Sequence, residues 1–420
     1  MLKQGYSFGG WLPRALLQGE DSNHQLRQFS SSDEHERWMH HAFLKAMDHI
    51  GLSSPNPTVG CTLVKENKLL AKGATLSYGD LHGERHAINL VENAKDIRNA
   101  TAYVMLEPCH HTGKQPPCTK VLKESGIIAC HGSVQDPNPL VQGKGFAYLR
   151  DQGIKTSTGV LRSEAIAWNY PFFVNQIYGR PMIAAKWAQS IDGCFGDDLG
   201  NSKWISSPSS RSYTHWLRQK YDAIVVGSQT VISDQPALTV RNCAPPINRH
   251  PLKVIIDPRG VILKTGPKIW QDIRQKTYSP PQKVIHVLGE ACKDSISKLK
   301  DCPNVKVIYC QESNFCASLI QRLSKQDITR FWGRPIASLM VEGGPNLISH
   351  FANAGLIDVY HTFINTSFLY GQKLRLTHTS PPLCHQRDRN KLLCAIPLEH
   401  DVLLEYLPED RYQKIFCPSS

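Results

Sequence analysis

The 420-residue chain lacks several features that would fix its class at once. No stretch approaches 18 uncharged apolar residues, which argues against a transmembrane helix, and residues 1–32 have no sustained apolar segment of the kind that a secretory signal needs. No internal repeat relates the two halves. The Gly-x-Gly-x-x-Gly fingerprint of dinucleotide-binding domains follows none of the expected strands. The length predicts two domains plus a tail, with residues 1–32 as a disordered N-terminal extension.

Positive charge and cysteine are both plentiful. The formal net charge of +12 favours anionic partners, either nucleic acid or phosphorylated small molecules, although a solvated basic surface has the same composition. The thirteen cysteines are irregularly spaced, which is typical of thiols in a reducing compartment and not of a disulfide framework. We therefore expect a cytoplasmic protein that does not bind membranes.

The first half of the sequence alternates helical and strand patterns in the order α-β-β-α-β-α-β. The expected helices cover residues 33–50, 84–93 and 118–125, and the expected strands cover 58–64, 69–74, 101–106 and 127–130. This order predicts a three-layer α/β domain over residues 33–160.

The second half predicts a different α/β domain over residues 180–408. Strand patterns at 182–187, 222–226, 252–256, 284–288, 305–309, 337–341 and 359–364 alternate with helical patterns at 213–220, 314–325 and 347–354. Such alternation favours a doubly wound, mostly parallel sheet. Residues 409–420 are expected to form a C-terminal tail.

His82, Cys109 and Cys118 are the most informative group in the sequence. One imidazole and two thiolates provide three ligands for a tetrahedral zinc ion and leave the fourth position open to water, as in catalytic zinc sites. Glu84 follows the imidazole by two residues, where its carboxylate can act as a proton shuttle. The order His-x-Glu followed by Pro-Cys is typical of zinc deaminases, in which this Glu is the general acid/base and not a ligand. Eight residues separate the two cysteines, which departs from the short Pro-Cys-x-x-Cys form.

The expected secondary structure brings these three ligands together. His82 and Cys118 each lie at the start of an expected helix, where the partial positive charge favours thiolate, and the strand at 101–106 leads towards Cys109. A closed structural site with His110 or His111 as fourth ligand remains open, as does a coincidence of spacing. A structural site has no need of a carboxylate beside an open position. We therefore expect hydrolytic deamination of an aminopyrimidine-like ring, with zinc-activated water as nucleophile.

The surrounding sequence resembles the bifunctional riboflavin-biosynthesis deaminase/reductase family from about residue 33 to 405. Matching motifs in the first half are 54–61 (SPNPTVGC), 106–109 (LEPC), 113–118 (GKQPPC) and 135–139 (QDPNP). Those in the second half are 186–193 (KWAQSIDG), 202–205 (SKWI), 222–227 (DAIVVG), 234–241 (DQPALTVR) and 341–345 (VEGGP).

The resemblance implies a cytidine-deaminase-like domain followed by a dihydrofolate-reductase-like domain, with Zn²⁺ and NADPH as cofactors. It implies deamination of 2,5-diamino-6-(5-phosphoribosylamino)pyrimidin-4-one, then reduction of the ribosyl group to ribityl, in a homo-oligomer. By motif position, the implied NADPH contacts are Ala188, Trp204, Thr230, Asp234, Glu342, Gly343, Gly344 and Pro345. The implied substrate contacts are Ser202, Arg218, Leu238, Arg241 and Glu342.

Three residues and one short segment depart from the family pattern. Gly83 stands where the family usually has Ala, a change that we expect to loosen the start of the helix. Gln235 replaces the second Asp of Asp-Asp-Pro, Pro258 stands where Ser is common after Asp257, and residues 364–367 (INTS) replace an Ala-Pro-Lys run. All but one of these changes lie in the second half.

Three alternatives follow from these observations. Changes in the second half favour an active deaminase with a weakened or lost reductase. The charge of +12 suggests a nucleic-acid-editing deaminase, but Lys and Arg are spread along the chain and the second domain would have no role. The third alternative is a non-catalytic binding module stabilised by zinc, which the carboxylate of Glu84 opposes. The bifunctional enzyme, with a phosphorylated small-molecule substrate and no nucleic acid, is the preferred interpretation.

Overall fold

A computed structural model describes residues 34–111, 116–139, 141–199, 205–241, 249–265, 282–293, 303–311, 314–370, 376 and 389–418. The chain divides into two compact units between Gly179 and Arg180. Within the described residues, none of the helices combines the length and the apolar character that crossing a membrane requires.

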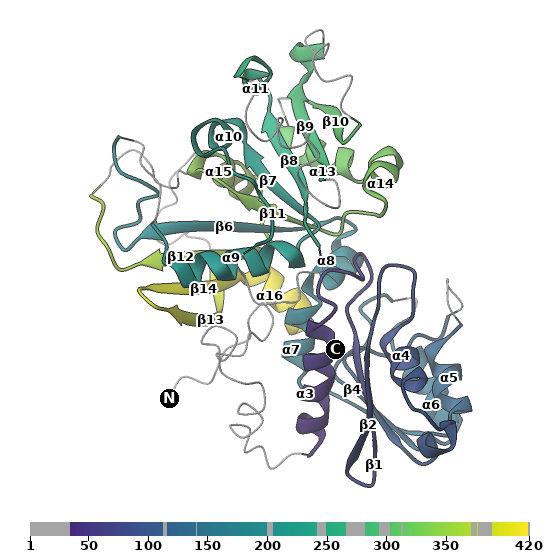
Figure 1. Cartoon of the computed structure of the whole chain (residues 1–420). Helices are drawn as coiled ribbons and strands as arrows, with labels where there is room; N and C mark the ends of the chain where they lie inside the picture. Colours follow the sequence, from purple (N-terminus) through teal and green to yellow (C-terminus); the bar gives the residue numbers. More distant parts are fainter. Residues whose placement is uncertain are drawn as a thin grey trace. The chain divides into compact units, whose positions relative to one another are not determined.

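The N-terminal unit is built on a five-stranded sheet with strand order β2-β1-β3-β4-β5 (Figure 1). Its strands are β1 (Gly60–Lys65), β2 (Lys68–Ala74), β3 (Thr101–Val104), β4 (Ala129–Gly132) and β5 (Lys155–Thr158). Its helices are α3 (Glu34–Met47), α4 (Gly83–Asn89), α5 (Cys118–Glu124), α6 (Lys144–Asp151), α7 (Arg162–Trp168) and α8 (Tyr170–Tyr178), with the 3-10 helix η1 (Ala94–Ile97). β1 pairs antiparallel with β2 and β3, whereas β3, β4 and β5 are parallel.

The amphipathic pattern of α3 explains how this unit forms its core. Met39, Ala42, Phe43 and Ala46 recur at helical spacing and are buried, and α3 lies against β1 and β2. Because β1 is antiparallel to both β2 and β3, and β4 is parallel to β3, the carboxyl ends of β2, β3 and β4 lie at one edge of the sheet. The helices α4 and α5, which follow β2 and β3, begin at this edge.

The C-terminal unit is built on a nine-stranded sheet with strand order β10-β9-β8-β7-β11-β6-β12-β14-β13. Its strands are β6 (Met182–Ser190), β7 (Ala223–Gly227), β8 (Leu252–Asp257), β9 (Val284–Gly289), β10 (Val305–Cys310), β11 (Ser338–Glu342), β12 (Val359–Asn365), β13 (Asn390–Leu398) and β14 (Asp401–Pro408). The strands from β10 to β12 are parallel, and only β14 and β13 are antiparallel to their neighbours. The doubly wound, mostly parallel sheet is confirmed.

The helices of this unit lie between its parallel strands in the sequence, except the last one, which follows β14. They are α9 (Pro208–Lys220), α10 (Ser228–Asp234), α11 (Val261–Thr265), α13 (Phe315–Leu323), α14 (Gln326–Trp332), α15 (Pro345–Asn353) and α16 (Glu409–Phe416). The apolar core lies between them and the sheet and includes Ile183, Val225, Val254, Leu339 and Phe351.

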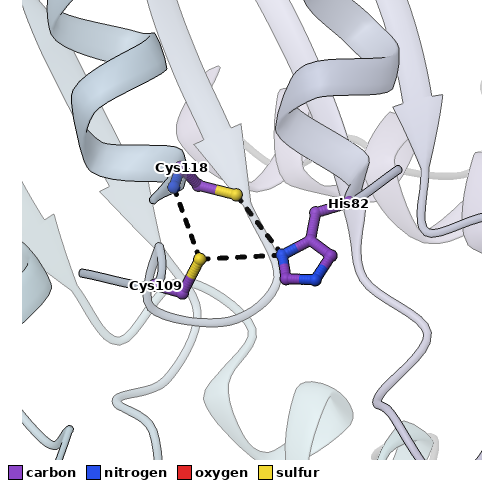
Figure 2. Close-up of side chains that lie close together, drawn as sticks. All are labelled: His82, Cys109 and Cys118. Carbon is purple, nitrogen blue, oxygen red and sulfur yellow. Dashed lines mark hydrogen bonds between the residues drawn. The ribbon is translucent and has the colours of Figure 1, made fainter. Parts of the chain in front are cut away.

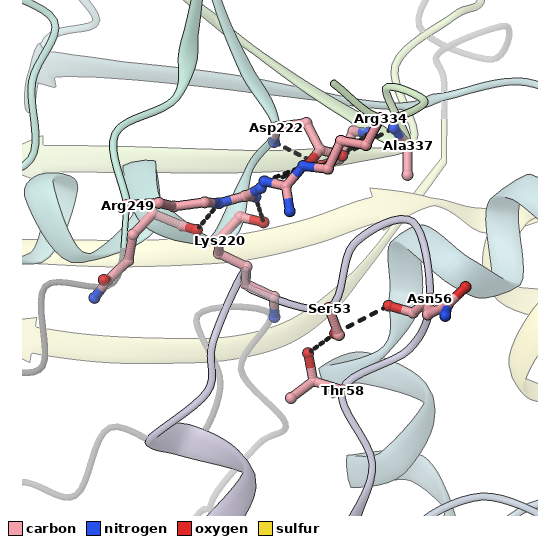
Figure 3. Close-up of polar contacts among 10 residues, drawn as sticks. Ser53, Asn56, Thr58, Lys220, Asp222, Arg249, Arg334 and Ala337 are labelled. Carbon is pink, nitrogen blue, oxygen red and sulfur yellow. Dashed lines mark hydrogen bonds and ion pairs between the residues drawn. The ribbon is translucent and has the colours of Figure 1, made fainter. Parts of the chain in front are cut away.

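Two buried carboxylates hold the ends of these elements. Asp222 accepts hydrogen bonds from Arg249 Nη1 and from the backbone N–H of Ala337, both at 2.8 Å, and so fixes the starts of β7 and β11 (Figure 3). Asp358 accepts from Arg180 Nη2 at 2.8 Å and from Arg411 Nε at 3.1 Å. The second cluster ties α16 to the start of the unit.

Several elements differ from the prediction. The interval between the two expected domains forms α7 and α8, because an apolar run starting at Ala165 is buried. The expected C-terminal tail begins with α16, whose Ile415 and Phe416 are buried. The hairpin β13–β14 was not predicted. The expected N-terminal extension, residues 1–32, lies outside the described residues.

Candidate active sites

The N-terminal unit brings His82, Cys109 and Cys118 together (Figure 2). His82 directly precedes α4, Cys118 is the first residue of α5, and Cys109 lies in the segment that follows β3. His82 Nδ1 is 3.6 Å from Cys109 Sγ and 3.4 Å from Cys118 Sγ. The three side chains therefore reach one point from three elements.

The spacing of these atoms fits a tetrahedral zinc ion. With Zn–S near 2.3 Å and Zn–N near 2.0 Å, neighbouring nitrogen and sulfur ligands are about 3.5 Å apart, which matches both measured distances. Hydrogen bonds from Cys118 and His82 lower the pKa of Cys109 against the opposing effect of burial, whereas the contact with Cys109 and burial raise the pKa of Cys118. Zinc binds the thiolate form of cysteine, so the surroundings of Cys109 favour metal binding.

Glu84 lies in the first turn of α4, and only 3% of its surface is exposed. Burial, followed by the charge of Cys109, raises the pKa of Glu84 to about 7. A carboxylate with a pKa near neutrality can both accept and donate a proton, which is the property that a general acid/base needs.

Glu107 anchors the segment that carries Cys109. Its Oε2 accepts hydrogen bonds from the backbone N–H groups of Asp136 at 3.1 Å and Gly143 at 2.9 Å, and its Oε1 accepts from Gly145 at 2.8 Å. The carboxylate is buried, at 3% exposure. It therefore joins the end of β3 to the start of α6, a positioning contact that spacing alone did not reveal.

The start of α4 packs directly on the backbone of the sheet at Gly83. A Cβ atom at this position would lie 2.3 Å from the carbonyl oxygen of Val59, which is far inside ordinary van der Waals contact. That oxygen accepts a hydrogen bond from Thr75 N–H at 2.9 Å and is therefore held in place. The structure thus gives Gly83 a role other than the expected loosening: it permits the close approach that places His82 and Glu84.

The C-terminal unit contains a cavity of about 1030 Å³ at the carboxyl ends of β6, β11, β7 and β8. Ten residues implied by the resemblance line it: Ala188, Arg218, Thr230, Asp234, Leu238, Arg241, Glu342, Gly343, Gly344 and Pro345. Ser202 and Trp204, the other two, lie outside the described residues. Ligands commonly bind at this edge of open parallel sheets.

An arginine–carboxylate pair lies in this cavity. Arg218 on α9 donates two parallel hydrogen bonds to Glu342 at the end of β11, Nε to Oε1 at 2.8 Å and Nη2 to Oε2 at 2.9 Å. Burial alone would raise the pKa of Glu342, but the charge and hydrogen bonds of Arg218 outweigh it and lower this pKa to about 2. The carboxylate is therefore ionised, and Arg218 is fixed with its remaining nitrogen bonded to Thr239 O at 3.1 Å.

Sequence reasoning missed five basic residues of the cavity wall: Lys186, Arg211, His215, Arg259 and His350. His215 precedes Arg218 by three residues and so shares its face of α9, a spacing that could have identified it. Burial, then the charges of Arg218 and Arg241, lower the pKa of His215 to about 4. The imidazole is therefore neutral at pH 7.

The departures in the second half have different places in the structure. Pro258 follows β8 and lines the cavity. Gln235 adopts the left-handed conformation, with φ of 42°, at the end of α10. Residues 364–367 end β12, and none of them is among the described residues of the cavity wall.

Two known protein families match this chain, one in the region of each site. The cytidine and deoxycytidylate deaminase zinc-binding region matches residues 32–131, and the RibD C-terminal domain matches residues 181–390. Each match contains one of the two sites.

Relatives that match most of this chain are named riboflavin biosynthesis protein RibD. The riboflavin biosynthesis protein RibD of Aquifex aeolicus is 35% identical over 329 residues, covering 78% of this chain and 86% of that protein. The RibD of Actinobacillus pleuropneumoniae is 32% identical over 375 residues, covering 88% and 94%.

Solved structures extend the similarity to the fold. Acinetobacter baumannii RibD has a TM-score of 0.72 at 30% identity and covers 91% of this chain and 99% of its own. A Thermotoga maritima diaminohydroxyphosphoribosylaminopyrimidine deaminase/5-amino-6-(5-phosphoribosylamino)uracil reductase has a TM-score of 0.74 at 30% identity and covers 89% and 98%. The expected cytidine-deaminase-like and reductase domains are thus confirmed, and the chain belongs to the RibD family of riboflavin biosynthesis proteins.

Proposed function

We propose that this chain catalyses two consecutive steps of riboflavin biosynthesis. The N-terminal unit deaminates 2,5-diamino-6-(5-phosphoribosylamino)pyrimidin-4-one, and the C-terminal unit reduces the ribosyl group of the product to ribityl with NADPH. One observation carries the proposal: a chain of the RibD family contains both sites. One site is a group of three zinc ligands with a buried Glu, and the other is a basic cavity at the edge of a parallel sheet.

In the deamination step His82, Cys109 and Cys118 are the proposed zinc ligands. Bound zinc supplies a water molecule that is acidic enough to act as hydroxide at neutral pH. Glu84 takes the proton that this water loses and returns it to the departing amine, for which its raised pKa and burial suit it. Gly83 stands between His82 and Glu84, and its tight packing fixes the helix start that carries both side chains.

In the reduction step the cavity residues bind and orient. Arg218 and Arg241 hold the phosphate of the substrate by charge-assisted hydrogen bonds, and Ser202 and Leu238 are further proposed contacts. Arg218 is preoriented by Glu342, and Arg241 donates to Thr239 Oγ1 at 2.9 Å. Both guanidinium groups are therefore placed before the substrate arrives, which lowers the entropic cost of binding.

The remainder of the cavity is the proposed NADPH site. Ala188 at the end of β6, with Trp204, is the proposed contact of the nicotinamide end, whereas Thr230, Asp234 and the loop from Glu342 to Pro345 contact the rest of the cofactor. Gly343 has a φ of 155°, and a Cβ there would lie 3.2 Å from Thr230 Oγ1, so a side chain at this position would strain the backbone and press on α10. The ten described residues that line one cavity favour an active reductase over the alternative of a lost one.

We also propose that the protein is a cytoplasmic homo-oligomer and that its positive charge serves a phosphorylated small molecule. None of the ten cysteines in the described part of the chain is in a disulfide, which is the pattern expected in a reducing compartment. Light scattering of the purified protein measures the oligomeric state directly, and a monomer at micromolar concentration would contradict this assignment.

The function is tested by a coupled assay on purified, zinc-replete protein. The diaminopyrimidine ribosyl phosphate is supplied, and ammonia release and NADPH oxidation are followed separately. We expect both signals from the wild type. Glu84→Gln should retain zinc and lose ammonia release, while still oxidising NADPH when it receives the deaminated intermediate. Full ammonia release by this variant would refute the role of Glu84, and ammonia without NADPH oxidation in the wild type would refute the reductase step.

A further inference from the structure

The cavity of the C-terminal unit extends beyond the residues that the proposed function uses. Its wall follows four adjacent strand ends in the order β8-β7-β11-β6. Neighbouring strands are about 4.8 Å apart, so the wall from β6 to β8 is about 14 Å long. The proposed nicotinamide and substrate contacts lie at the β6 and β11 end, and the glycine loop faces α10 beside β7. The β8 end is left for the adenosine half of the cofactor.

The β8 end of the cavity combines apolar and basic side chains. Ile256 and Pro258 belong to the strand end, Phe315 begins α13, and Leu347 lies in the first turn of α15; all four line the cavity. Apolar and aromatic groups of this kind suit the faces of a purine ring. Arg259 adds a positive charge to the same wall.

Arg259 differs from Arg218, the cavity arginine that a carboxylate holds in place. Arg218 uses two of its nitrogens on Glu342, whereas the guanidinium of Arg259 is exposed and makes no hydrogen bond or ion pair with any residue that the structure describes. Pro258, its neighbour, has neither a backbone N–H nor a hydroxyl group to offer an anion. At this strand end, therefore, the guanidinium is the group suited to a phosphate.

The backbone that carries Arg259 is held rigidly. Asp257 is fully buried and accepts from the N–H groups of Val261 and Ile262, each at 2.9 Å, and His286 Nε2 is 3.1 Å from the same carboxylate. The carbonyl oxygen of Pro258 accepts from Gly289 N–H at 3.0 Å. A charged side chain on a fixed turn loses less entropy when it binds a ligand.

We propose that Arg259 binds the 2′-phosphate of NADPH and is the residue that makes the reductase prefer NADPH to NADH. The inference rests on the proposed function of this cavity. NADPH and NADH differ only in that phosphate, and a guanidinium binds a phosphate dianion with two parallel, charge-assisted hydrogen bonds. Arg259 takes over a recognition role that a hydroxyl group at position 258 could otherwise share.

The test is a binding measurement on the full-length, zinc-replete protein without turnover. Calorimetric titrations with NADPH, NADH, adenosine 2′,5′-bisphosphate and adenosine 5′-monophosphate are compared for wild type and Arg259→Gln. We expect the Kd of the two ligands with a 2′-phosphate to rise about 10- to 100-fold, as for loss of a charge-assisted pair. The Kd of NADH and of the monophosphate should change less than about twofold, and Arg259→Lys should recover part of the loss.

Arg330 provides the matched control, because it is an exposed arginine on α14 that does not line the cavity. Arg330→Gln removes the same net charge and should leave all four affinities unchanged. Equal losses for NADPH and NADH in Arg259→Gln, or unchanged NADPH affinity, would overturn the inference while leaving the reductase function intact. A wild-type protein that binds neither nucleotide would instead refute the reductase function, and the inference with it.

Discussion

The glycine at position 83 allows a quantitative test of how the zinc site is held. The proposed change is Gly83→Ala, which adds a single Cβ atom at this position. The new Cβ would lie 2.3 Å from Val59 O, about 1.1 Å closer than ordinary contact at 3.4 Å, and 3.5 Å from the Cα of Ala74. Val59 O cannot turn away without weakening its hydrogen bond from Thr75 N–H.

Two effects of this substitution oppose each other. Alanine favours a helix over glycine by about 0.5–1 kcal/mol, whereas overpacking against a fixed atom costs about 1–3 kcal/mol. We expect the clash to dominate and the unfolding free energy of the N-terminal unit to fall by about 1–2 kcal/mol. A displacement of about 1 Å in catalytic groups lowers rates up to about 100-fold, so ammonia release should fall more strongly than stability.

The assays separate packing from helix propensity. Urea unfolding, zinc content and ammonia release are measured for Gly83→Ala and for Asn89→Ala, which adds alanine at the exposed end of the same helix. NADPH oxidation with the deaminated intermediate serves as an internal control in the other unit and should not change. A Gly83→Ala protein that is as stable as wild type and fully active in deamination would refute the packing argument.

Two further predictions concern stability. Asp358→Asn leaves Arg180 and Arg411 facing a neutral amide at a site with 0% exposure. We expect the unfolding free energy of the C-terminal unit to fall by about 3–5 kcal/mol. A loss below about 1 kcal/mol in urea unfolding would contradict this role. Burial, then the charge of His41, lowers the pKa of His40 to about 4. The unfolded chain therefore protonates this imidazole near pH 6.5, whereas the folded chain does not. As the pH falls from 6.5 to 4, the unfolding free energy should decrease by up to about 1.4 kcal/mol per pH unit. The slope of unfolding free energy against pH should become shallower in His40→Gln, and an unchanged slope would rule out this imidazole as its source.

The zinc site could be predicted because its residues are close together in the sequence and form a recognisable pattern. His82 and Glu84 are two residues apart, and Cys118 directly follows two prolines, which mark the start of a helix. The residue types and the expected helix starts together located the site. The strands of the second half were predictable for a related reason. Buried parallel strands are continuous apolar runs such as Ile224–Val226 between polar segments, and these are visible without a partner.

Other elements depend on contacts that the local sequence does not encode. In β13 the burial pattern is irregular, because a register shift between Leu392 and Cys394 breaks the alternation that identifies a strand. Arg259 was missed because its relation to Glu342 depends on strand order: β8 and β11 lie on either side of β7, although about 80 residues separate them in the chain. Sequence spacing predicts which side chains share an element and not which strand ends share a cavity.

The position of β11 has a consequence for how the protein is made. β11 lies between β6 and β7, so β6 is not joined to β7 in one sheet until a strand that is synthesised more than 100 residues later is inserted between them. Such long-range closure is slow and leaves strand edges exposed on the ribosome. The N-terminal sheet, in contrast, is complete by Thr158. We therefore expect the zinc-binding unit to fold while the reductase unit is still being translated, and the nucleotide cavity to form only after β11 and α15 have been made.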